Sequence, residues 1–109
     1  MTGIPAASGP PIVVALPAEI DVTNADQVYD RLRAPFAAGA ATVIADLTAT
    51  TFCDSRGIDR IITAWSKAEA SGRQLRVAVS PGGEVANLME LLGIGQALTL
   101  YPSVDEAAR

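Results

Sequence analysis

Apolar positions along the chain alternate between the periods that are typical of strands and of helices. Residues 11–16, PIVVAL, form a β-branched run that predicts a strand, and residues 42–48 and 74–79 predict two more. A short strand is expected at 97–101, and residues 1–10 are expected to form a short N-terminal strand or a flexible arm. The pattern therefore predicts a sheet of roughly four to five strands.

Helical spacing fills the intervals between these predicted strands. Thr23 or Asn24 is the expected N-cap of a first helix, which Pro35 should kink or end and Gly39 should close. Further helices are expected from Ile58 to a stop at Gly72, along Val85, Leu88, Met89 and Leu92 to a stop at Gly93, and after the capping box formed by Ser103 and Glu106.

The alternation of strands and helices predicts parallel neighbouring strands joined by right-handed crossovers. The strands themselves alternate in polarity, with Gln74 and Arg76 opposite Leu75 and Val77. Strands that are covered on both faces would be more uniformly apolar. We therefore expect an α/β fold with a mixed, mostly parallel sheet and helices packed mainly on one face. At 109 residues, without repeats or a long linker, the chain is expected to be a single domain over 1–109.

Charge and composition exclude several classes of function. The net charge is −4 and the basic residues are scattered, so nucleic-acid binding is not expected. The chain has no signal-peptide pattern, and no apolar run approaches the roughly 20 residues that span a bilayer. We expect a cytoplasmic protein that acts on other proteins and neither binds nor crosses a membrane.

The absence of histidine is the most informative count. It removes the serine and cysteine triads, most transition-metal sites and the commonest general base. The single cysteine, Cys53, is expected to be a small buried residue rather than a nucleophile. The SPGG turn at 80–83 lacks the lysine of a phosphate-binding loop and is expected to be an ordinary turn. We therefore predict no enzyme, no catalytic residue, no metal site and no cofactor.

One junction, Asp54-Ser55-Arg56-Gly57, stands where a strand and a polar loop give way to a helix. In one interpretation Asp54 or Ser55 caps that helix and Gly57 relieves crowding. In the other, the Ser55 hydroxyl is accessible and accepts a phosphate, which the helix N-terminus favours. A phosphate adds about −1.5 to −2 charges beside Asp54. Two like charges about 4 Å apart repel by about 4 kcal/mol at an effective dielectric near 20, enough to switch off a protein contact.

Several segments together resemble a known family. They are LPAEID, VIADLTATTFCDSRGI, SGRQLRVAV, LMELLGI and LTLYPSVDEAA, in family order from about residue 11 to 107. With these the chain resembles a STAS domain (the STAS/SpoIIaa-like fold), the module shared by bacterial anti-sigma factor antagonists and sulfate-transporter tails. The Asp-Ser-x-Gly core is short, but its position after a strand that ends in Asp-Leu makes it more specific.

The resemblance implies a switch rather than a catalyst. An antagonist of this kind binds an anti-sigma factor of the serine kinase type and so frees the sigma factor. The kinase, with its own ATP and magnesium, phosphorylates a serine that corresponds to Ser55, and the contact breaks. A phosphatase acting on phospho-Ser55 restores it. Asp21 corresponds to an acidic residue of the family that lies near the partner surface.

The chain departs from the family at two places, Arg56, where many relatives carry Ser or Thr, and Pro17-Ala18, where a glycine is common. Two alternatives stay open, an unphosphorylated STAS scaffold and a ligand-sensing module with a pocket at the 80–83 turn and Asp54. The predicted partner-binding residues are Asp21, Asp54, Ser55, Arg56, Gly57 and Ile58, with phosphorylation at Ser55.

Overall fold

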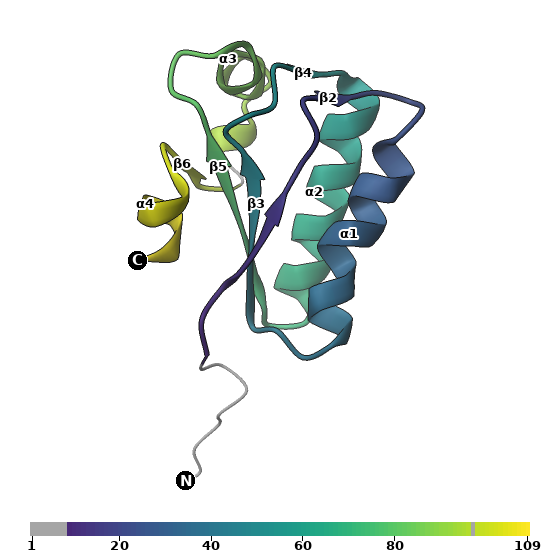
Figure 1. Ribbon diagram of the computed structural model, residues 1–109, viewed down its shortest axis with the longest axis vertical. Coiled ribbons are helices and arrows are strands. Elements are labelled where there is room, and N and C mark those ends of the chain that lie inside the picture. The colour runs from purple at the N-terminus through teal and green to yellow at the C-terminus, as the bar shows by residue number, and fades with distance from the viewer. Residues whose placement is uncertain (1–8, 97) are drawn as a thin grey trace, which may run out of the picture.

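The computed structural model of the chain describes residues 9–96 and 98–109 (Figure 1). The expected features at residues 1–8 and at residue 97 lie outside the described residues. In chain order, the elements are β1 (Ile12–Ala15), β2 (Glu19–Ile20), α1 (Ala25–Ala37), β3 (Thr42–Leu47), β4 (Phe52–Cys53), α2 (Ser55–Ala70), β5 (Gln74–Val79), α3 (Glu84–Leu91), the 3-10 turn η2 (Ile94–Gln96), β6 (Leu100–Tyr101) and α4 (Val104–Ala108).

The main sheet has four strands in the order β1-β3-β5-β6, and neighbouring strands within it are parallel. Val43 of β3 is paired with Ile12 of β1 on one side and with Leu75 of β5 on the other. Outside this sheet, β2 and β4 form a separate two-stranded parallel ribbon. The predicted α/β fold with a mostly parallel sheet is confirmed.

Helices α1 and α2 lie side by side on one face of the sheet, and the short helix α4 lies on the opposite side (Figure 1). Leu32 of α1, Ile61 of α2 and Val77 of β5 are almost completely buried in the layer between helices and sheet. On the other face, Ala107 of α4 covers Ile44 and Ala78. The expected arrangement, with helices mainly on one face, is therefore confirmed, and α4 covers part of the other face.

The ends of the helices follow the local sequence closely. Helix α1 runs through Pro35 and ends two residues later at Ala37, with Gly39 at a positive φ of 107°. Pro35 lacks the N–H that would donate to the carbonyl oxygen four residues earlier, and the helix ends within the same turn. Ser103 caps α4 by accepting a hydrogen bond from the Glu106 N–H at 3.1 Å, as the capping box predicts. Leu92 was expected in the third apolar stripe, but it follows the end of α3 and is 53% exposed.

The β2–β4 ribbon lies at the end of the molecule where α1 and α2 begin, and both helices run from there toward the opposite end (Figure 1). This arrangement follows from the parallel sheet, because each strand-to-helix connection returns to the same edge. The residues singled out at the Asp54–Ile58 junction and at Asp21 therefore lie at one end of the fold. No helix in the described residues is long and apolar enough to cross a membrane.

Candidate functional site

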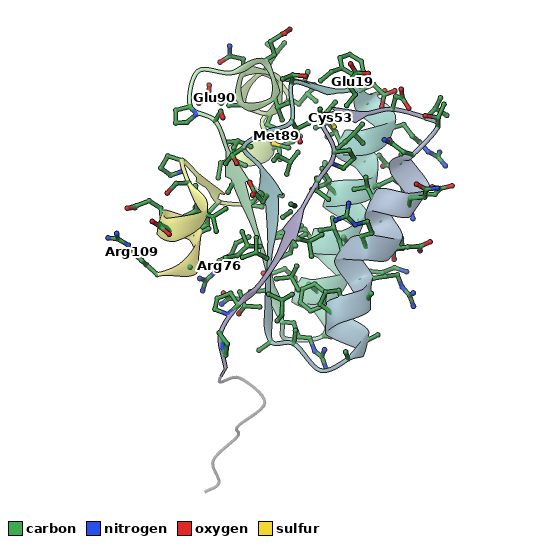
Figure 2. All side chains as sticks on the ribbon, viewed as in Figure 1. Glu19, Cys53, Arg76, Met89, Glu90 and Arg109 are labelled. Carbon is green, nitrogen blue, oxygen red and sulfur yellow. The ribbon has the colours of Figure 1, made fainter. Side chains whose placement is uncertain are left out.

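The β2–β4 ribbon brings two loops together that are far apart in the sequence. Ile20 is paired with Cys53, and the Asp54 N–H donates to the Ile20 carbonyl oxygen at 3.0 Å. The chain after each strand therefore continues side by side, with Asp21 beside Asp54. Figure 2 shows Glu19 and Cys53 of this ribbon at the start of the helix pair.

The unusual approach to Asp21, at Pro17-Ala18, is held by the loop that precedes β4. The Thr50 hydroxyl donates to the Pro17 carbonyl oxygen at 2.8 Å, and the Thr51 N–H donates to the Ala18 carbonyl oxygen at 2.8 Å. Thr50 is a buried polar residue, and this bond satisfies its hydroxyl. The departure from the family pattern thus gives an approach that is fixed by backbone contacts.

Asp54, and not Ser55, caps helix α2. The Asp54 backbone is extended, and its carboxylate accepts a hydrogen bond from the Gly57 N–H at 3.0 Å. This is the standard geometry of an acidic N-cap. Ser55 is then the first residue of the helix, and its side chain is exposed. The two interpretations of the junction therefore apply to different residues, because the cap leaves the Ser55 hydroxyl accessible.

Gly57 and Ile58 form the buried side of the same helical turn. A Cβ atom at Gly57 would lie 2.6 Å from Cγ2 of Ile20 and 2.7 Å from Sγ of Cys53. Glycine thus lets α2 approach the β2–β4 ribbon more closely than any other residue would allow. Ile58 is 3% exposed. Both residues were predicted to contact a partner, and in this structure they lie beneath the surface and fix the position of the residues above them.

Arg56 is directed toward helix α1. Its Nη2 lies 3.4 Å from Oδ1 of Asp26, and Nε of Arg60 lies 3.6 Å from the same oxygen. The exposed pair of Arg56 with Asp26 contributes about 0 to 1 kcal/mol. Arg60 also lies over the Tyr29 ring, with its Cζ atom 4.0 Å from the ring centroid. Asp26 is therefore the ion-pair partner of both arginines.

Asp21 is organised by its own loop. The Thr23 hydroxyl and the Thr23 N–H, the latter at 2.9 Å, both donate to its Oδ1. The hydrogen bond from the Thr23 side chain is the main reason that the pKa of Asp21 is lowered from its ordinary value. Asn24, the N-cap of α1, accepts from the Asp21 N–H and donates to the Glu19 carbonyl oxygen. Asp21 therefore presents a fixed negative charge beside the Asp54 cap.

The Cys53 thiol is buried and has a raised pKa. Its side chain is 4% exposed, and burial, with a smaller effect from Asp54, raises its pKa to about 12. A thiol with this pKa stays protonated near neutral pH, and the thiolate is the reactive form. The prediction of a small buried residue is confirmed.

Two apolar side chains at this end of the molecule were missed by the sequence analysis. Phe52 of β4 is 50% exposed, and Val22, just after β2, is 73% exposed. A large apolar residue in the polar loop before Asp54 was the available signal for Phe52. Aromatic residues are enriched where proteins bind one another, so Phe52, three residues from Ser55, is a candidate contact residue.

Within the described residues, the hollow beside the 80–83 turn is not lined by Asp54. Gly82 has a positive φ of 75°, and the Ser80 hydroxyl donates to the Thr48 carbonyl oxygen at 2.7 Å. A hollow of about 230 Å³ adjoins the turn, but Pro81, Gly82 and Tyr101 are among its lining residues and Asp54 is not. The ordinary turn expected at 80–83 is what the structure has there.

Comparison with known proteins identifies the family. The family model of the STAS domain matches residues 4–107. The chain belongs to the STAS domain family. A search among curated proteins found no matching relative of this STAS domain.

Solved structures share the fold of this STAS domain. An anti-sigma factor antagonist from Mycobacterium paratuberculosis is 24% identical, with a TM-score of 0.78 over 87% of this chain and 80% of the other. A putative anti-sigma factor antagonist from Thermotoga maritima is 19% identical, with a TM-score of 0.75 over 87% and 83% of the two chains. The Bacillus cell fate determinant SpoIIAA in its phosphorylated form is 21% identical, with a TM-score of 0.63 over 87% and 85%.

Proposed function

We propose that this STAS domain is an anti-sigma factor antagonist whose binding is switched by phosphorylation at Ser55. In the unphosphorylated form it binds an anti-sigma factor of the serine kinase type, so that the sigma factor is released. Transfer of a phosphoryl group from the kinase's ATP to Oγ of Ser55 forms the O–P bond, with ADP as leaving group and loss of the hydroxyl proton. A phosphatase hydrolyses that bond and restores binding.

The observation that carries this proposal is that Asp54 and Ser55 have different roles at the start of the helix. Asp54 supplies the helix cap, so the Ser55 side chain is exposed and is not needed to start α2. A kinase can reach such a hydroxyl without unfolding the helix. The phosphoryl oxygens would then lie at the N-terminus of a 16-residue helix, where the free N–H groups and the dipole favour an anion.

Charge explains why a tolerated phosphate would still break a contact. The new group, with about −1.5 to −2 charges, would add to the negative charges of Asp54 and Asp21 at this end of the molecule. A partner that binds the neutral hydroxyl would have to desolvate this charge, and a loss of about 1.4 kcal/mol already weakens binding tenfold. The fold would survive, whereas the complex would not.

Arg56 moderates this switch without removing it. Its guanidinium is 52% exposed and is shared with Asp26 at 3.4 Å. To neutralise a phosphate on Ser55 it would have to leave Asp26, so part of the gain would be lost. Phe52 and Val22 supply the apolar area that a docking partner needs around a polar centre. The names of the solved structures with this fold, all under 25% identical, are in line with this assignment.

The modification is tested by the intact mass of the protein purified from its native host, with and without phosphatase treatment. We expect a fraction that is heavier by one phosphoryl group and that phosphatase removes, and we expect Ser55→Ala to lack it. Ser66, exposed on the same helix, provides the matched control, because Ser66→Ala should keep the heavier form. A phosphate that persists in Ser55→Ala would contradict the assignment.

The switch is tested by affinity capture from the same host with wild type, Ser55→Ala, Ser55→Glu and Ser66→Glu. We expect wild type, Ser55→Ala and Ser66→Glu to retain a serine kinase that also binds a sigma factor. Ser55→Glu should bind it at least about tenfold more weakly. Equal capture by Ser55→Glu, together with an unmodified native mass, would instead indicate a constitutive STAS scaffold.

A further inference from the structure

Three basic side chains line one hollow at the opposite end of the helix pair from Ser55. Arg33 of α1, Lys67 of α2 and Arg73, just before β5, border a cavity of about 490 Å³. They are three of the eight lysine and arginine residues of a chain whose net charge is −4. In Figure 1 this is the end where both helices finish, away from β2 and β4.

These three cations are not neutralised within the part of the chain that the structure describes. The ion pairs there join Arg56 and Arg60 to Asp26, and Arg109 to Glu106. No acidic side chain is among the residues that line the cavity. Like charges gathered around a concave surface raise the local positive potential, which attracts an anion of matching size.

Two hydrogen bonds hold the guanidinium group of Arg73 in place. Its Nη1 donates to the carbonyl oxygens of Phe36 and, at 3.2 Å, of Ala40, where α1 and the following turn end. Within the described residues its Nη2 and Nε make no hydrogen bond, so these donors are available to a ligand. A guanidinium whose plane is already fixed loses less entropy when it binds an anion.

Apart from Ser71, the rest of the cavity wall is formed by aromatic residues and alanines. Tyr29 and Phe36 line it from α1, and the small side chains of Ala64 and Ala68 line it from α2 and leave the space open. Nζ of Lys67 lies 5.7 Å from the centroid of the Tyr29 ring. Cations beside the Phe36 ring and the alanine side chains suit a ligand with one anionic group and one flat ring. The volume is within the range of about 300 to 1,000 Å³ that is usual for small-molecule sites.

Helix dipoles account for only part of this arrangement. They favour cations at helix carboxyl ends, and Lys67 lies in the last turn of α2. The dipole effect does not by itself explain the open space between the cations or the aromatic side chains that line it. We propose that the hollow between Arg33, Lys67 and Arg73 binds a small organic anion, an aromatic phosphate or carboxylate. The proposal does not depend on the function assigned to Ser55, which lies at the other end of α2.

The test uses 1-naphthyl phosphate as the probe and the full chain labelled with ¹⁵N. We expect saturable amide shifts centred on residues 64–73 and on the last turn of α1, with Ser55 and its neighbours unmoved. Inorganic phosphate and 1-naphthol, which each keep one half of the probe, should bind at least about tenfold more weakly. Shifts centred elsewhere, equal binding of inorganic phosphate, or no saturation up to about 10 mM would overturn the proposal.

A matched pair of double variants separates a site from general attraction. Arg33→Gln/Lys67→Gln removes two cations from the cavity, whereas Arg31→Gln/Arg109→Gln removes two from outside it. Calorimetric titration should show a loss of about tenfold or more for the first pair and less than about twofold for the second. Equal losses would refute a defined site. The wild-type shift map needs no variant, so it decides the matter even if a variant folds poorly.

Discussion

Ser55 and Gly57 are only two residues apart in α2, yet they lie on opposite sides of its first turn. The outer side carries the exposed Ser55 and Arg56, and their neighbours are solvent and the Asp26 carboxylate. The inner side carries Gly57 and Ile58, which are buried. A Cβ atom at Gly57 would overlap Ile20 and Cys53. Exposed and tightly packed positions are thus separated within four residues. Each side can therefore be changed while the other is measured.

The largest effect is expected at Ile58. Ile58→Ala should lower the free energy of unfolding by about 2 to 5 kcal/mol, because it removes a buried side chain and leaves a cavity. Ile12, which is 42% exposed, provides the same substitution outside the core. Ile12→Ala should cost less than about 1 kcal/mol. Urea denaturation measures both, and similar losses would mean that the inner side is not the more tightly packed region.

Gly57→Ala should cost about 1 to 3 kcal/mol, because its new methyl group overlaps Ile20 and Cys53. Gly95 is the matched control, since a Cβ atom there meets nothing within 4 Å. Gly95→Ala should be close to neutral in the same denaturation experiment. Adding Cys53→Ala to Gly57→Ala should cost less than the sum of the two single changes. Strict additivity would contradict the contact with the sulfur atom.

Asp54→Ala should cost about 0.5 to 2 kcal/mol, because the Gly57 N–H loses its acceptor. Asp54→Asn keeps a cap acceptor and removes the charge, so its stability should remain near that of wild type. Thermal unfolding, with both variants at the same pH, separates the two effects. If Asp54→Asn were as unstable as Asp54→Ala, the charge rather than the hydrogen bond would be what starts the helix.

The smallest change in stability is expected at Ser55 itself. Ser55→Ala should alter the free energy of unfolding by less than about 0.5 kcal/mol, because the exposed hydroxyl has no part in the cap. Ser80→Ala is the comparison, since its hydroxyl donates to the Thr48 carbonyl oxygen at 2.7 Å. That variant should cost about 1 kcal/mol. A loss at Ser55 as large as that at Ser80 would show that the outer side also supports the fold.

The sequence predicts the long elements well because their periods are long enough to be seen. Five apolar positions between Ala25 and Phe36 and the alternation in 74–79 correspond to α1 and β5. The two-residue strands β2 and β4 were not expected, because two residues cannot display a period. They exist through pairing with each other, a contact between segments more than thirty residues apart.

The candidate site shows the same division between local and distant causes. The junction at Asp54 and Ser55 is visible in the sequence, but both residue types are good caps. Which of them is the cap depends on the residue at which the helix begins. The need for glycine at position 57 depends on Ile20, and the direction of Arg56 depends on Asp26 in another helix. Neither of these contacts has a local signal.

Because Asp54 is the cap, positions 54 and 55 are expected to tolerate different sets of substitutions. In a randomised library screened only for soluble expression, position 54 should keep its few capping side chains, while position 55 should accept almost any small or polar residue. Folding is therefore not expected to require a serine at position 55. A phosphate on Ser55 would therefore act on a protein that is already folded.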